Sequence, residues 1–314
     1  MGTSTMASRP GARTLTARPA RSRSVHARAQ DRLLGYALVT PIVVIMAVVI
    51  AFPLVNAVLT SLRDERVIGS PSDWVGFETY TQVVADPTFW GALGRSGIWL
   101  VVNMIVQTVL AFATALLLQR RGVWSRTART WVMLPWVIPT VAVAVIWQWM
   151  LNSNYGIVYR MFAAVGIDLG SPFSDTGVAL LAVILVNSWH WFPLAAVVIY
   201  GALATVPGEV LEAAKMDGAN AWQTFWAVTF PLLQPVLFAL GLVGSLWSFN
   251  VLDTILLITG GGPAGATTTA PVHIYETAFG AFRSSEAAAA SVLAVIVLAV
   301  AAVLFVKFLR PEED

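Results

Sequence analysis

Two groups of polar and aromatic side chains interrupt apolar segments of this sequence, at spacings that could bind a solute. The first group follows the helical spacing i, i+3, i+4, i+7 on one face and consists of Asn187, His190, Trp191 and Leu194. The second group repeats that spacing in the next apolar segment and consists of Gly244, Trp247, Ser248 and Val251. Asn250, which lies beside this face, is included among the candidates. Trp rings pack on the apolar faces of a sugar, while amides and hydroxyls hydrogen-bond its edge. Because polar groups at membrane depth are costly, we take these residues as candidate substrate contacts.

Two residues near these faces have alternative interpretations. His190 could instead hydrogen-bond a neighbouring helix, and a lone His without a second ligand at suitable spacing predicts no metal site. At 100° per residue, Asp253 lies nearly opposite the face of Trp247 and Ser248. In a regular helix it cannot line the same cavity, so we expect it to pair with a polar group on a neighbouring helix or a partner subunit. No cluster of Arg or Lys accompanies the candidate contacts, which disfavours a phosphorylated ligand.

A third feature is the loop 205–231, which is acidic although it joins two apolar segments. Pro207 suits the first turn of a helix, where no amide partner is lost, and Gly218 can take a left-handed stop conformation. Asn220 with Gln223 three residues later predicts a second helix that begins with a capping box. The loop therefore predicts a helix, a tight turn and an amphipathic helix at the inner membrane face. It could be a simple connector or a docking element for a cytoplasmic partner.

The elements that position these groups are predicted to be membrane-spanning helices. The chain has 314 residues, 57% hydrophobic and 11% charged, against about 25% charged in soluble domains. It has no Cys, which excludes disulfides and thiolate sites. A spanning helix needs about 20 mainly apolar residues, and open sheets cannot cross lipid. Six segments meet the requirement and predict an all-α membrane protein: Leu33–Leu62, Gly97–Gln119, Ala128–Leu151, Val178–Leu203, Leu232–Thr259 and Ala287–Leu309.

The distribution of basic residues predicts that both termini are cytoplasmic. Residues 1–32 contain seven Arg and one acidic residue, without apolar periodicity, so we expect a disordered cytoplasmic tail. The alternative is a signal peptide, but the first apolar run is long and we expect it to be retained as a span. The loop between the second and third predicted spans and the C-terminus are also basic. The loop between the fourth and fifth spans, 205–231, is acidic and departs from this bias, which suggests a dedicated role. Nucleic acid is not expected as a partner, because the Arg-rich segment is short.

Two smaller expectations concern residue types at span ends. Five Trp are predicted to be interface anchors rather than ligand contacts, namely Trp74, Trp90, Trp99, Trp124 and Trp131. Five Pro are predicted to kink helices where neighbours re-satisfy the backbone, namely Pro41, Pro53, Pro135, Pro139 and Pro193. The Ala-rich last segment predicts close helix packing.

The acidic loop resembles a known family. Its stretch "EAAKMDGANAWQTFWAVTFPLL" resembles the EAA signature of membrane subunits of binding-protein-dependent ABC importers, in which matching positions are Glu212, Ala213, Ala214, Asp217, Gly218 and Pro231. Phe230 replaces the usual Leu before that proline. The stretches 74–96, 187–195 and 249–269 resemble the first permease of carbohydrate importers of the maltose and glycerol-phosphate type. The resemblance covers about 33–309.

The resemblance implies the six-helix type I ABC importer permease fold, with a permease domain at 33–310 whose core is 95–309. It implies coupling to a cytoplasmic ATPase through the EAA loop (205–231), by Glu212, Ala213, Ala214, Asp217 and Gly218. It also implies a second homologous permease, two ATPase subunits that bind ATP and Mg²⁺, and an external substrate-binding protein. The chain would lie in the bacterial inner membrane, move a sugar-like solute and be no enzyme. The candidate substrate contacts approximately match positions where the maltose-type permease contacts its sugar.

Other classes have less support in the sequence. A stand-alone secondary transporter would need inverted repeats and ion-coupling groups, and a membrane enzyme would need a catalytic constellation that the sequence does not show. The chain has no GxxxxGK[ST] phosphate loop, so no cofactor is expected in this chain itself. The stretch "LITGGGPAG" is interpreted as a flexible turn on the outer side. The substrate stays open among disaccharides, oligosaccharides, polyols and glycerol-phosphate compounds.

Overall fold

The computed structural model describes residues 2, 25–67, 69–119, 123–167 and 169–309. In this part of the chain the regular elements are helices, joined by turns and loops, and one isolated bridge pairs Arg63 with Trp74. The chain divides into two compact units, Met1–Val55 and Asn56–Asp314, which are described separately. The first unit contains most of α1 (Val25–Ser61), an apolar helix. The second contains the elements that follow: α2 (Glu78–Ala85), α3 (Pro87–Leu118), α4 (Val123–Val137), α5 (Thr140–Met150), α6 (Ile157–Ala164), α7 (Ala179–Leu203), α8 (Gly208–Met216), α9 (Ala221–Thr224), the π-helical turn η1 (Phe225–Thr229), α10 (Phe230–Phe249), α11 (Asp253–Ile258), α12 (Ala270–Tyr275), the π-helical turn η2 (Glu276–Gly280) and α13 (Ser284–Leu309).

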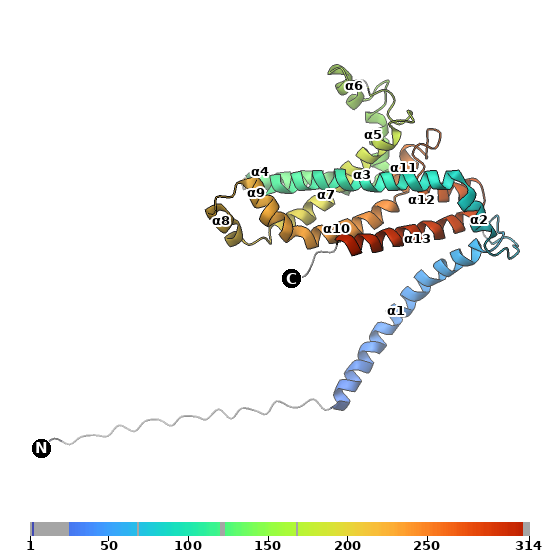
Figure 1. Cartoon of the computed structure of the whole chain (residues 1–314), viewed down its shortest axis with the longest axis horizontal. Helices are drawn as coiled ribbons and strands as arrows, with labels where there is room; N and C mark the ends of the chain where they lie inside the picture. The colour runs from blue at the N-terminus through green and yellow to red at the C-terminus, as the bar shows by residue number, and fades with distance from the viewer. Residues whose placement is uncertain (1, 3–24, 68, 120–122, 168, 310–314) are drawn as a thin grey trace. The chain divides into compact units, whose positions relative to one another are not determined.

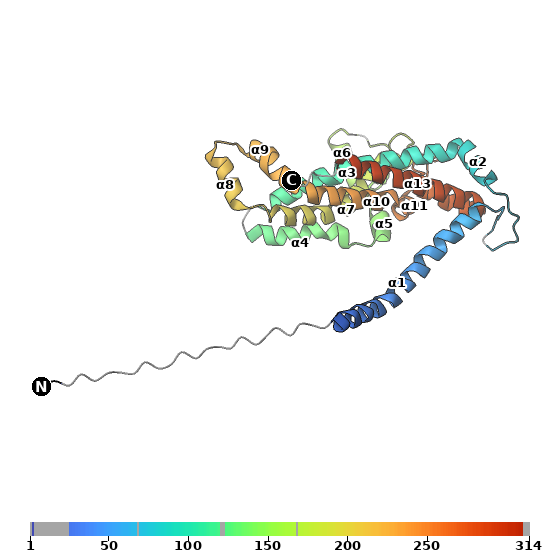
Figure 2. The same cartoon turned by 60° about the horizontal axis from the view of Figure 1, so that its bottom comes forward.

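Four long helices of the second unit, α3, α7, α10 and α13, lie side by side and are called the bundle here (Figures 1 and 2). The short elements α2 and α12 lie at one end of the bundle, and α8 with α9 lies at the other. Five described helices are long and apolar enough to cross a membrane, and a sixth crossing results if α4 and α5 are taken as one span. The predicted all-α membrane architecture is therefore confirmed.

Small side chains let the bundle helices approach one another. One apolar cluster joins α3, α7 and α10 through Ala111, Ala115, Ala196, Ile199 and Leu233, all of them buried. A second packs Phe89 of α3 against the Ala-rich start of α13, as predicted from the last apolar segment. In lipid no hydrophobic driving force brings helices together. Close backbone contact between small residues is therefore a usual basis of helix association there.

Three predicted boundaries were wrong. The helix α1 begins at Val25, inside the segment 1–32 that was predicted to be a disordered tail, while residues 3–24 lie outside the described residues. The third predicted span is broken: α4 and α5 meet at 95° beside Pro139, which cannot donate the backbone bond that would continue the helix. The fifth predicted span ends at Phe249 rather than Thr259.

The glycine-rich stretch after α11 forms a turn, as predicted, and side chains hydrogen-bond to its backbone. The Oγ1 atoms of Thr267 and Thr268 donate to the carbonyls of Gly262 and Gly261 at 2.8 and 3.0 Å, and all three threonines at 267–269 are buried. Gly261 has φ +83° and a Cβ there would lie 2.8 Å from the Thr268 hydroxyl, so only glycine fits.

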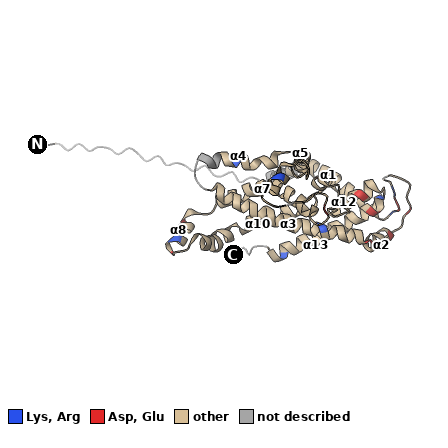
Figure 3. Cartoon of the chain, turned by 90° about the horizontal axis from the view of Figure 1, so that it is seen from above, with Lys and Arg blue, Asp and Glu red and all other residues tan. Residues whose placement is uncertain are grey.

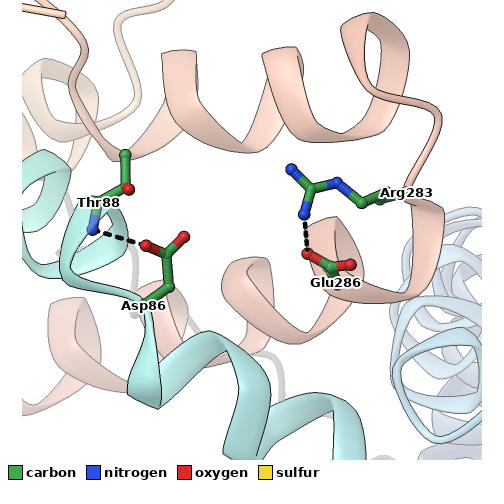
Figure 4. Close-up of polar contacts among 4 residues, drawn as sticks. All are labelled: Asp86, Thr88, Arg283 and Glu286. Atoms are coloured by element: carbon green, nitrogen blue, oxygen red, sulfur yellow. Dashed lines mark hydrogen bonds and ion pairs between the residues drawn. The ribbon is translucent and has the colours of Figure 1, made fainter.

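Polar contacts also fix the turns at this end of the bundle. The Asp86 carboxylate accepts a hydrogen bond from the Thr88 backbone N–H at 2.8 Å and caps α3, and Arg283 pairs with Glu286 at 2.8 Å (Figure 4). The Thr88 side chain, and then its backbone N–H, lower the pKa of the Asp86 carboxyl. The cap therefore stays charged over the physiological pH range.

Candidate functional site

A cavity of about 1250 Å³ lies among the helices of the bundle. Side chains from α3, α7, α10 and α13 line it, together with Asn250 and Val251 after α10 and Asp253 at the start of α11. Aromatic side chains form much of its wall: Phe112, Trp191, Phe230, Phe238, Trp247, Phe305 and Phe308. The cavity is thus an apolar space with a few polar groups, as is usual for a site that binds a small molecule.

Eight of the nine predicted substrate contacts line this cavity: Asn187, Trp191, Leu194, Gly244, Trp247, Ser248, Asn250 and Val251. Trp191 and Trp247 come from α7 and α10, and their rings meet edge to face at 6.4 Å. The hydroxyl of Ser248 is buried and has no hydrogen-bond partner in the described part of the chain. The structure therefore brings the two predicted faces together around one space, with an aromatic pair beside an unpartnered hydroxyl.

His190 is the predicted contact that does not line the cavity. Its side chain is buried, and Nε2–H donates to the carbonyl oxygen of Ile138 at 3.0 Å. That carbonyl lies at the break between α4 and α5, where the helical partner is missing. His190 therefore holds the bend by an interhelical hydrogen bond, which was the alternative interpretation of this residue.

Asp253 lines the cavity, contrary to the prediction from a regular helix. The helix α10 stops at Phe249, and α11 begins again at Asp253 after a three-residue break. The prediction assumed a constant 100° per residue, which does not hold across this break, so Asp253 does not lie opposite Trp247 and Ser248. The Oδ1 atom of Asp253 accepts a hydrogen bond from the Thr254 backbone N–H at 2.9 Å.

Side-chain donors satisfy two carbonyls near the end of α10. Asn250 Nδ2 donates to the carbonyl of Leu246 at 2.8 Å, and Trp99 Nε1 donates to the carbonyl of Ser248 at 3.0 Å. Orphan carbonyls at a helix end need such partners. Trp99 was predicted to be an interface anchor, and this prediction was wrong: its side chain is fully buried beside the cavity. Trp74, Trp90 and Trp131 are exposed and stay predicted interface anchors, while the side chain of Trp124 lies outside the described residues.

A buried polar network behind the cavity was missed by the sequence analysis. Asn103 Oδ1 accepts hydrogen bonds from Asn187 Nδ2 at 2.9 Å, Ser188 Oγ at 3.0 Å and Gln107 Nε2 at 3.2 Å. Gln107 and Asn187 both line the cavity, so Asn103 orients two amides that face it. The rule that flags polar residues at membrane depth applies equally to Asn103 and Gln107 and would have found them.

The second candidate site is the hairpin formed by α8, Gly218 and α9. Gly218 has φ +81°, the Ala219 N–H donates to the Ala214 carbonyl at 3.0 Å and the Gly218 N–H donates to the Lys215 carbonyl at 3.0 Å. These two bonds form a Schellman cap, which needs a left-handed residue that glycine supplies without strain. The capping box is also present, because Asn220 and Gln223 exchange side chain-to-backbone bonds at 2.9 Å. Both local predictions for this loop are confirmed.

The surface of this hairpin is open. None of the residues of α8 is buried; Glu212, Ala213, Asp217 and Gly218 are exposed, and Ala214 is half-buried. Met216 and Trp222 have exposed fractions of 88% and 70%, large for apolar side chains. The helix α8 carries both acidic and basic residues, whereas most of the bundle is uncharged (Figure 3). An isolated nine-residue helix is marginal in water, so this exposed face suits contact with another protein.

Comparisons with known proteins identify the family of the chain. Residues 107–313 match the family model described as "Binding-protein-dependent transport system inner membrane component". The chain is 30% identical over 299 residues to the diacetylchitobiose uptake system permease protein DasB of Streptomyces coelicolor, covering 92% of this chain and 91% of DasB. It is 32% identical over 265 residues to the inner membrane ABC transporter permease protein YcjO of Escherichia coli, covering 82% and 87%.

The fold is also that of a solved transporter. A bacterial ABC transporter involved in the import of the acidic polysaccharide alginate matches with a TM-score of 0.77 and 20% identity, over 92% of this chain and 99% of that one. At this identity the likeness concerns the fold. The family model covers well over half of the chain, and it selects the ATP-driven class over the stand-alone transporter that the sequence left as an alternative. The chain belongs to the family of binding-protein-dependent inner membrane components, the multi-pass permease subunits of ABC importers, whose ATPase is a separate subunit.

Proposed function

We propose that this permease subunit moves a sugar or sugar-like solute through the cavity of the bundle. The observation that carries the proposal is the edge-to-face pair of Trp191 and Trp247 beside the unpartnered hydroxyl of Ser248 and the amides of Asn187 and Gln107. Aromatic faces and neutral hydrogen-bonding groups match a ring that is apolar on its faces and polar on its edge. The name of the relative DasB, which concerns diacetylchitobiose, supports this class.

The assembly that we propose is supported by the family and by the exposed hairpin. In this proposal the chain has six spans with both termini in the cytoplasm, so the hairpin α8–α9 lies on the cytoplasmic side and contacts an ATPase subunit. A second homologous permease, two ATPase subunits that bind ATP and Mg²⁺, and an external binding protein complete the importer. One related structure is of the alginate transporter with its pentasaccharide-bound periplasmic protein, which supports delivery from outside.

The coupling role is proposed for the exposed end of the hairpin, at Glu212, Ala213, Ala214, Asp217 and Gly218. Closure of the ATPase dimer on ATP would move this end, and α9 continues through η1 into α10, which lines the cavity. A movement of the hairpin is therefore passed along one continuous segment to the candidate site. Hydrolysis of ATP would then return the cavity to its inward-open state.

The test is reconstitution of the complete importer in proteoliposomes. ATP-dependent uptake is measured for maltose, cellobiose, glycerol and glycerol 3-phosphate, each delivered by the external binding protein. We expect uptake of a carbohydrate and none of glycerol 3-phosphate. Uptake of glycerol 3-phosphate alone would refute the neutral sugar class. Uptake that needs an ion gradient but no ATPase subunit would refute the coupling scheme.

A further inference from the structure

The cavity carries a single charge among the described residues that line it, the carboxylate of Asp253. Its other hydrogen-bonding side chains are neutral: Gln107, Thr108, Asn187, Gln234, Ser248 and Asn250. Lys307 lies between Phe305 and Phe308 in sequence, but it does not line the cavity and its Nζ lies 5.9 Å from the ring centroid of Phe308. A ligand in this space therefore meets the negative charge of Asp253, which no cation among the described lining residues offsets.

The position of Asp253 leaves its carboxylate open to a ligand. The side chain is exposed, and its Oδ1 accepts one hydrogen bond from the Thr254 backbone N–H at 2.9 Å. A carboxylate has about four acceptor sites, so most of them remain for groups in the cavity. Ser248 gives a second observation at the same place, because its hydroxyl is buried, lines the cavity and lacks a partner in the described chain.

We propose that Asp253 determines the charge specificity of the cavity. It accepts hydrogen bonds from hydroxyl or ammonium groups of a carbohydrate and repels sugars that carry a carboxylate, sulfonate or phosphate. Like charges in a space of low dielectric repel strongly, and such repulsion is an effective way to reject an unwanted ligand. This inference rests on the proposed function, since it assigns the class of carbohydrate that the same cavity takes.

The experiment uses the importer purified with the subunits that accompany the full-length chain. Binding is followed by quenching of Trp fluorescence, because Trp191 and Trp247 line the cavity. The probes are three β-1,4-linked disaccharides of similar size: neutral cellobiose, cationic chitobiose and anionic cellobiouronic acid. The variants are Asp253→Asn, the charge-retaining Asp253→Glu, and Asp73→Asn, which removes an exposed acid outside the cavity.

The expected result is a change of ranking in one variant only. In Asp253→Asn the affinity for cellobiouronic acid relative to cellobiose rises about tenfold and the relative affinity for chitobiose falls, as removal of a nearby like charge predicts. Asp253→Glu and Asp73→Asn keep the wild-type ranking.

Other outcomes overturn the inference in distinguishable ways. An unchanged ranking in Asp253→Asn removes the specificity role. Loss of accompanying subunits from Asp253→Asn, but not from Asp253→Glu, shows that Asp253 pairs with a partner subunit instead. If no disaccharide quenches the fluorescence of the wild type or any variant, the carbohydrate site of the proposed function fails, and this inference fails with it.

Discussion

The hairpin α8–α9 and the cavity belong to the same unit of the chain, but different ranges of the sequence determine their geometry. In the hairpin, the cap at Gly218 and the capping box at Asn220 join residues no more than five positions apart. At the cavity, Trp99 reaches Ser248 across 149 positions, and Asn103 reaches Asn187 across 84. Local hydrogen bonds give the hairpin its conformation, whereas contacts between helices give the cavity its shape.

The difference has a physical reason that bears on function. The hairpin has no buried residue in α8, so its own hydrogen bonds must preserve its conformation. The cavity wall is supported by buried polar groups, which are costly in lipid unless each has a partner. We therefore expect changes at the hairpin to affect assembly and coupling, and changes behind the cavity to affect stability and solute binding.

The largest effect is expected from Asn103→Leu. It removes the acceptor shared by Asn187, Ser188 and Gln107, which should destabilise the chain by about 2–3 kcal/mol. The measurement is the melting temperature of the purified protein in detergent. Ser291→Ala is the control, because Ser291 donates only to Ala287 of its own helix. Equal melting temperatures for the two variants would show that the network does not support the cavity.

Gly218→Val should uncouple the importer while leaving the cavity intact. A β-branched residue at φ +81° costs about 2 kcal/mol, and nothing lies within 4 Å of its Cβ, so the effect is conformational. Recovery of ATPase subunits with the tagged chain should fall about tenfold or more. Gly218→Asn is the control, since Asn tolerates the left-handed region and should retain most of the assembly. Full recovery with Gly218→Val would contradict the docking role.

Trp247→Ala tests the cavity rather than the hairpin. It removes one ring of the pair with Trp191, and we expect the affinity for a bound disaccharide to fall about tenfold, or about 1.4 kcal/mol. Recovery of ATPase subunits should stay unchanged, which separates the cavity from the hairpin. Trp149→Ala is the control because Trp149 is exposed and lies outside the cavity. If both Trp variants reduce the affinity equally, the aromatic pair is not the site.

The same contrast explains which features could be predicted from the sequence. Gly218, Asn220 and Gln223 were predicted correctly because every atom of their motifs lies within one short stretch. Helical spacing also placed Asn187, Trp191 and Trp247 on the faces that meet, since that spacing depends only on a regular helix. Asp253 was misplaced, because the prediction continued a regular helix past Phe249, where α10 ends and the indole of Trp99 from a distant helix donates to the carbonyl of Ser248. His190 depended in the same way on the bend at Ile138.

The smallest effect is expected from Asn220→Ala, and it is the most sensitive test of whether the hairpin is locally determined. The substitution removes the capping box and should cost about 1 kcal/mol, so ATPase subunits should bind about fivefold more weakly in a titration of their concentration. Asn220→Ser retains a side-chain acceptor at the cap and should behave like the wild type. Because α9 continues through η1 into α10, a lost cap could also disturb the cavity. Unchanged disaccharide affinity in Asn220→Ala would show that the hairpin and the cavity are independent at rest, so that only ATP-driven movement connects them.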